Sequence, residues 1–120
     1  AGHSFEGKVM GTVMVYREAC RFLGVEPTWT PDALFPEPLV PNIEIDATDI
    51  SDEKALWNAV QMVYNVELDD QRFRAAPGKF DKLRREYPMR REFQFTNVKT
   101  VNSSRKLKQK FSGLGFKIEQ

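Results

Sequence analysis

Apolar residues recur at helical spacing near the start of the chain. The four that would share one helix face are Val13, Tyr16, Cys20 and Leu23. This spacing predicts a helix over residues 12–23, with Gly24 placed to end it. A strand over residues 9–16 is the competing interpretation, because Val, Thr and Tyr favour strands. The helix is preferred, since the charged residues of the segment fall outside the apolar stripe.

A second helix is predicted from Ser51 to about Tyr64. Ser51 is a typical N-cap, and the acidic residues Asp52 and Glu53 follow in the first turn, where the helix dipole favours negative charge. The apolar residues of its stripe are Leu56, Ala59, Val60 and Val63.

Shorter elements are predicted in the second half. Helical spacing indicates short helices over residues 71–76 and 79–87, the second ended by a proline, and another over 104–112 that begins at a serine. Residues 92–96 alternate between polar and aromatic side chains, which predicts a half-buried strand. Residues 116–118 are interpreted as a closing strand.

A proline-rich segment over residues 25–42 separates the first two helices. It holds five of the seven prolines, and because proline removes a backbone donor, the segment must be extended or turned. Its large apolar side chains imply that this arm lies against its own domain or docks on a partner. The residues assigned to partner binding are Trp29, Leu34 and Phe35. A short strand is expected over residues 43–46.

These elements predict an α+β fold in one helix-dominated domain. The small antiparallel sheet would lie near the C-terminus, with a winged-helix-like arrangement as one interpretation. The 120 residues suit one domain. Residues 1–4 are interpreted as a tag remnant and 5–120 as the domain, with an acidic half (5–70) and a basic half (71–120). The longest apolar run is four residues, too short for a membrane span.

The distribution of charge along the chain is the feature that points most strongly to a function. The formal net charge is +1, but residues 1–70 carry −9 and residues 71–120 carry +10. Such asymmetry points to nucleic acid or to a charged partner. The sequence therefore predicts a non-catalytic module that binds DNA or RNA through phosphate contacts. The cations assigned to that role are Lys82, Arg84, Arg85, Arg90, Arg91, Arg105, Lys106, Lys108 and Lys110.

Two other interpretations of the charge remain open. The acidic half and the basic half can complement each other within one molecule. They can also join neighbouring molecules, which would make the protein an assembly or adaptor domain with the arm reaching across to its partner.

Candidate catalytic chemistry is sparse. His3 is the only histidine and Cys20 the only cysteine, which leaves no Ser-His or Cys-His pair outside the presumed tag and no zinc set. Gly113-Leu114-Gly115 lacks the third glycine of a dinucleotide fingerprint. Glu44 and Asp46 would share a strand face and form the weak alternative of a metal-dependent nuclease. No cofactor or metal is expected. A single thiol and the lack of a signal peptide favour a reducing, intracellular location.

Overall fold

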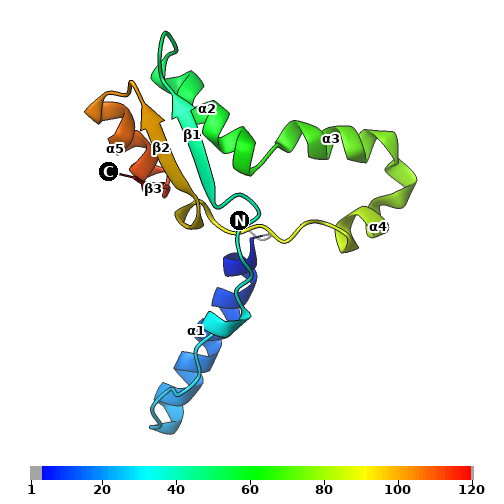
Figure 1. Ribbon diagram of the computed structural model, residues 1–120. Helices are drawn as coiled ribbons and strands as arrows, with labels where there is room; N and C mark the ends of the chain where they lie inside the picture. Colours follow the sequence, from blue (N-terminus) through cyan, green and yellow to red (C-terminus); the bar gives the residue numbers. More distant parts are fainter. Residues whose placement is uncertain (1–3, 120) are drawn as a thin grey trace.

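A three-stranded parallel sheet forms the centre of the protein (Figure 1). The computed structural model describes residues 4–119. Its strands, in sheet order, are β1 (Asn42–Asp46), β2 (Asn97–Val101) and β3 (Lys117–Ile118). Ile43 lies opposite Val98, and Val98 in turn lies opposite Ile118. Each strand reaches the next through at least one helix, as parallel pairing requires.

Most of the helices begin at side-chain caps that the sequence provides. The helices are α1 (Phe5–Leu23), α2 (Asp52–Val63), α3 (Val66–Ala75), α4 (Phe80–Arg85) and α5 (Arg105–Gly113), with three-residue 3-10 turns η1 (Asp32–Leu34), η2 (Pro77–Lys79) and η3 (Phe93–Phe95). Ser4, Ser51, Asn65 and Ser104 each accept a hydrogen bond from a first-turn amide of α1, α2, α3 and α5, respectively, whereas α4 has no side-chain cap. Such caps satisfy amides that have no partner within the helix.

The core lies between the sheet and two helices, α2 and α5. Its buried residues are Ile43, Ile45, Ala55, Ala59, Val98, Leu107, Phe111 and Phe116. Side chains alternate along β1, so the two isoleucines point into this core while Asn42, Glu44 and Asp46 are exposed. Glu44 pairs with Lys99 of β2 at 2.7 Å on that exposed side. Parallel sheets are usually covered on both faces. Here the exposed polar side chains of β1 and β2 allow the face opposite the core to remain in contact with water.

Helix α1 and the proline-rich arm form a second body that extends away from the sheet (Figure 1). Gly24 ends α1 in the left-handed conformation, with φ 67°. The arm then turns back along the helix: the Tyr16 hydroxyl accepts hydrogen bonds from the amides of Thr28 (3.0 Å) and Trp29 (3.2 Å). The rings of Tyr16 and Trp29 meet edge to face at 5.6 Å. The arm is therefore packed on its own chain.

Helices α3 and α4 form a third body, a helical hairpin that extends beyond α2 in a different direction from α1 (Figure 1). Phe73 and Phe80 pack edge to face across it, with ring centroids 6.0 Å apart. Neither helix packs extensively on the sheet or on α2 and α5 within the described part of the chain.

The three bodies give the protein an open shape. The Cα radius of gyration is 18.2 Å, whereas a compact domain of this length has about 14 Å. Many large apolar side chains are consequently exposed on α1 and on the hairpin. None of the helices in the described residues is long and apolar enough to cross a membrane.

The predicted antiparallel sheet is wrong. All strands are parallel, and β1 comes from the acidic half of the chain. Strands joined through helices are typical of α/β rather than α+β architecture, and a winged-helix arrangement is not formed. The strand predicted over residues 92–96 is instead the turn η3, in which the Thr96 amide bonds to the Phe93 carbonyl at 2.9 Å.

The predicted helices are largely present, with different bounds. Helix α1 begins at Phe5 instead of residue 12 because Ser4 caps it, and the competing strand over residues 9–16 is not formed. Helix α2 has the predicted cap, with the Ser51 hydroxyl accepting from the Lys54 amide at 3.2 Å. Helix α3 begins five residues earlier than predicted, because Asn65 caps it. The tag-remnant assignment falls mostly on residues 1–3, which lie outside the described residues.

Candidate functional site

Two consecutive arginines, Arg90 and Arg91, lie where the three bodies meet. They follow the hairpin and precede η3, so their backbone connects α4 to the sheet. The Arg90 carbonyl accepts a hydrogen bond from the Phe5 amide at 2.8 Å, which fixes this point to the start of α1. The two side chains point to different bodies.

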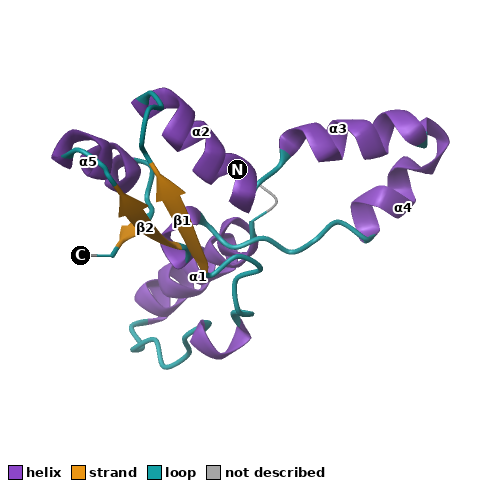
Figure 2. Ribbon diagram, turned by 45° about the horizontal axis from the view of Figure 1, so that its top comes forward, coloured by secondary structure: helices purple, strands orange, loops and turns teal. Residues whose placement is uncertain are grey.

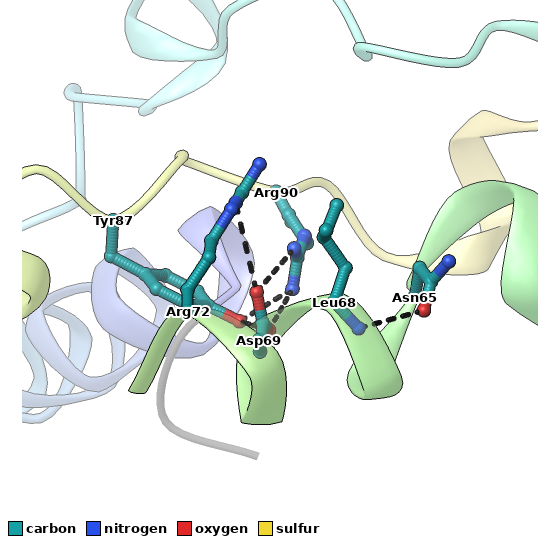
Figure 3. Close-up of polar contacts among 6 residues, drawn as sticks. All are labelled: Asn65, Leu68, Asp69, Arg72, Tyr87 and Arg90. Atoms are coloured by element: carbon teal, nitrogen blue, oxygen red, sulfur yellow. Dashed lines mark hydrogen bonds and ion pairs between the residues drawn. The ribbon is translucent and has the colours of Figure 1, made fainter. Parts of the chain in front are cut away.

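Arg90 binds the hairpin through Asp69 (Figure 3). Its Nη1 lies 3.2 Å from Asp69 Oδ2, and its Nη2 lies 3.5 Å from Oδ1. Nη1 also donates to the Tyr87 hydroxyl at 2.5 Å, and that hydroxyl donates to Asp69 Oδ2 at 2.5 Å. The guanidinium carbon lies 4.3 Å from the Tyr64 ring centroid and 4.9 Å from that of Tyr87. One side chain thus contacts the end of α2, helix α3 and the segment after α4.

Burial and hydrogen bonding set the charges of this cluster. Burial acts to raise the pKa of Asp69, but hydrogen bonds from Tyr87 and Arg90 outweigh it and hold that pKa below its ordinary value. Burial, together with the hydrogen bond to Asp69, raises the pKa of Tyr87. At neutral pH the cluster is therefore a carboxylate, a neutral phenol and a guanidinium. A carboxylate held in this state is a poor general base, so the arrangement suits binding and positioning.

A groove of about 680 Å³ lies beside this cluster, between α3 and α4. Both apolar or aromatic and charged side chains line it: Phe73, Phe80, Leu83, Tyr87 and Pro88, together with Asp69, Arg72, Arg84 and Glu86. Asp69 and Tyr87 belong both to this groove and to the Arg90 cluster.

Arg91 ties α1 to the sheet body through a buried ion pair. Its Nε bonds to Glu6 Oε1, and Nη1 donates to the Pro36 carbonyl of the arm. The second Glu6 oxygen accepts from the Glu92 amide at 2.9 Å. The guanidinium lies 3.7 Å from the Phe95 ring centroid. The side chains of Arg91 and Glu6 are only 7% and 9% exposed, so this pair is structural and closed to a ligand.

The remaining predicted cations do not form one surface. Lys82, Arg84 and Arg85 lie on α4, whereas Arg105, Lys106, Lys108 and Lys110 lie on α5, on the far side of the sheet from the hairpin in both views (Figures 1 and 2). Among residues 4–119, Lys82 pairs with Glu86 at 3.9 Å and Lys110 with Asp52 at 2.8 Å.

Ion pairs within the molecule neutralise part of the charge asymmetry. The long-range ion pairs join the acidic half to the basic half: Glu6 to Arg91, Glu44 to Lys99, Asp52 to Lys110 and Asp69 to Arg90. A chain that is split by charge in sequence is thus mixed in space. These ion pairs agree with the interpretation in which the acidic half and the basic half complement each other within one molecule.

The residues assigned to partner binding are partly used within the chain. Trp29 packs on Tyr16, and Phe35 meets Phe5 edge to face at 5.2 Å. Leu34 is exposed.

The carboxylates of the weak nuclease alternative are occupied by other partners. Glu44 pairs with Lys99, and Asp46 accepts from the Thr48 hydroxyl at 2.7 Å and from Asn102 at 3.2 Å. Among the described residues, no group of three His, Cys, Asp or Glu side chains could hold a metal ion.

The sequence interpretation missed the acidic and aromatic partners of the two arginines. Tyr87 and Arg90 are three residues apart, but Asp69 precedes Arg90 by 21 residues and Glu6 precedes Arg91 by 85. No local spacing relates positions so far apart. The available local signal was the Arg-Arg pair two residues after Pro88, the proline expected to end a helix.

Comparisons with known proteins identify relatives that are enzymes. An erythronate-4-phosphate dehydrogenase of Marinobacter nauticus is 34% identical over 99% of this chain, which covers 33% of the relative. The same-named protein of Pseudomonas putida is 37% identical over 96% of the chain and 32% of its own length. That of Sodalis glossinidius is 37% identical over 86% of the chain. The chain thus spans about a third of the length of these relatives.

These relatives overturn the function predicted from charge. They are named as dehydrogenases, so the prediction of a non-catalytic module that binds DNA or RNA is wrong, and so is its alternative of charge-complementary assembly. Residues 34–115, most of the chain, match a family model described as "Domain of unknown function (DUF3410)", and the chain therefore belongs to that family.

Proposed function

We propose that this chain is part of an enzyme, a dehydrogenase that acts on erythronate 4-phosphate. The observation that carries the proposal is the similarity to proteins of that name over 96–99% of the chain. Since those relatives are about three times as long, the activity would belong to the longer protein and not to these residues alone.

The described residues do not fit a dinucleotide cofactor. Dehydrogenases commonly transfer hydride to a nicotinamide dinucleotide, and sheets that bind one carry a glycine-rich turn between the first strand and its helix. The turn after β1 is residues 47–51, Ala-Thr-Asp-Ile-Ser, without glycine. Gly113 and Gly115 lie at and just after the C-terminal end of α5. The phosphates of a dinucleotide bind instead at the N-terminus of a helix. We therefore assign no step of hydride transfer to this chain.

The role we propose for this region is to pack against the remainder of the enzyme. Helix α1 supports it: Val13 and Cys20 are buried on the face where Tyr16 contacts the arm, while the opposite stripe includes Val15, 72% exposed, and Phe22, 88% exposed. Apolar side chains at this exposure are stabilised when another surface removes them from water. The other two-thirds of the enzyme can supply that surface.

The proposed activity is tested on the longer protein that contains this chain. We expect it to oxidise erythronate 4-phosphate with reduction of an added nicotinamide dinucleotide, followed by absorbance of the reduced cofactor. We also expect the 120 residues alone to show neither turnover nor dinucleotide binding. Binding of the dinucleotide to the 120-residue chain would contradict the assignment of cofactor binding to the remainder.

We further propose a reducing, intracellular location. The support is Cys20, a free thiol buried on the covered stripe of α1, which is common for proteins of reducing compartments.

A further inference from the structure

We propose that Arg90 is a positioning residue that latches the α3–α4 hairpin at a fixed angle to the sheet. The latch consists of Arg90, Asp69, Tyr87 and Tyr64. The inference rests on contacts within this chain and does not depend on the dehydrogenase assignment.

The hairpin is attached to the rest of the protein by two short segments. Residues 64–65 lead from α2 into α3, and residues 86–92 lead from α4 to η3. The hairpin has little packing against the sheet layer within the described residues and projects from it in both views (Figures 1 and 2). Its orientation must therefore come from contacts near these two segments.

The backbone of Arg90 is held by the part of the protein that the hairpin is attached to. The Arg90 carbonyl accepts from the Phe5 amide at 2.8 Å, and the next residue, Arg91, is buried against Glu6. The Arg90 side chain extends from this anchored point to the hairpin. It is 18% exposed, as is its partner Asp69 on α3. Partial burial protects the pair from the solvent screening that weakens surface ion pairs.

The contacts use properties that only arginine has. The planar fork donates to both oxygens of Asp69 (Figure 3), and the guanidinium carbon lies over the rings of Tyr64 and Tyr87. A lysine ammonium could replace the charge but neither the fork nor the stacking. Tyr64 marks the end of α2 and Tyr87 the start of the returning segment, so the guanidinium joins both attachment segments at once.

The test is hydrogen exchange, measured by mass spectrometry on peptides from the hairpin and from the sheet body. In Arg90→Met and in Asp69→Asn we expect amides of α3 and α4 to exchange about tenfold faster, because local opening needs less free energy once the latch is broken. Peptides from β1, β2 and α5 should exchange as in the wild type. Arg85→Met is the matched control, since Arg85 is an exposed arginine on α4, and it should leave all peptides unchanged.

Two further variants separate a latch from a general stabilising contact. Arg90→Lys should behave like Arg90→Met, and the double variant with Asp69→Asn should add no further increase, because both changes break the same contact. Full rescue by lysine, an unchanged hairpin, or an equal increase in the hairpin and in α5 would each overturn the proposal. If Arg90→Met does not fold, Arg90→Lys and Asp69→Asn still decide between these outcomes.

Discussion

Replacing Phe111 by alanine is expected to lower the free energy of unfolding by about 3–5 kcal/mol. Phe111 is fully buried beneath the sheet, and its ring meets Phe116 edge to face at 6.0 Å. Truncation removes the apolar contacts of the ring and leaves a cavity that the small sheet cannot close. Because whole domains are stable by only about 5–15 kcal/mol, this change removes much of the stability of the sheet body.

Urea unfolding followed by far-ultraviolet circular dichroism measures this loss. Lys106→Ala is the control on the same helix, since Lys106 is exposed and surface replacements usually change stability by less than about 0.5 kcal/mol. A loss below about 1.5 kcal/mol in Phe111→Ala would show that the core is not where the structure places it.

Replacing Arg91 by methionine is expected to destabilise the protein by about 3–5 kcal/mol, because it leaves the Glu6 carboxylate buried without its partner. The loss of stability in this single variant should exceed the net contribution of the intact ion pair to stability. The double variant Glu6→Leu with Arg91→Met should therefore recover much of the loss, since apolar residues often replace a buried pair at little cost. Thermal unfolding of the two single variants and the double variant gives the coupling between the positions.

The matched control is Arg21→Met, which breaks the exposed pair between Arg21 and Glu18. Exposed pairs contribute little to stability, so this variant should unfold like the wild type. A double variant of Glu6 and Arg91 that is less stable than either single variant would argue against a buried, mutually dependent pair.

Local sequence patterns were sufficient for elements with local causes. Helix α2 could be predicted because Ser51, the acidic first turn and the apolar stripe act within one segment. Helix α5 could be predicted for the same reason, from Ser104 and the pair Leu107 and Phe111.

Strand direction could not be predicted because it depends on pairing between distant residues. Asn42 of β1 lies opposite Asn97 of β2, and nothing in either segment specifies that partner. Phe93 and Phe95 alternate as they would in a strand, but their burial has separate causes. Phe93 stacks on Phe116 with centroids 4.5 Å apart, and Phe95 lies under Arg91. A 3-10 turn satisfies both contacts.

The sequence identified the two arginines of the candidate site but not their acidic partners. Arg90 and Arg91 were singled out, but as surface cations, because a count of charges does not show which are paired. The structure places both at the junction, with Asp69 and Glu6 as partners. The net charge of a segment predicts a charged surface only when that segment is separate in space from the segment of opposite charge. In this protein the two halves are in contact.

We propose that this chain packs against the remainder of a dehydrogenase, and Phe22→Asp in the longer protein tests that packing. Phe22 is 88% exposed in this chain, so a charge there should matter only if the rest of the enzyme covers it. We predict a lower melting temperature and reduced oxidation of erythronate 4-phosphate, while Arg17→Asp, at an exposed polar position of α1, changes neither. Wild-type stability and turnover in Phe22→Asp would contradict the claim.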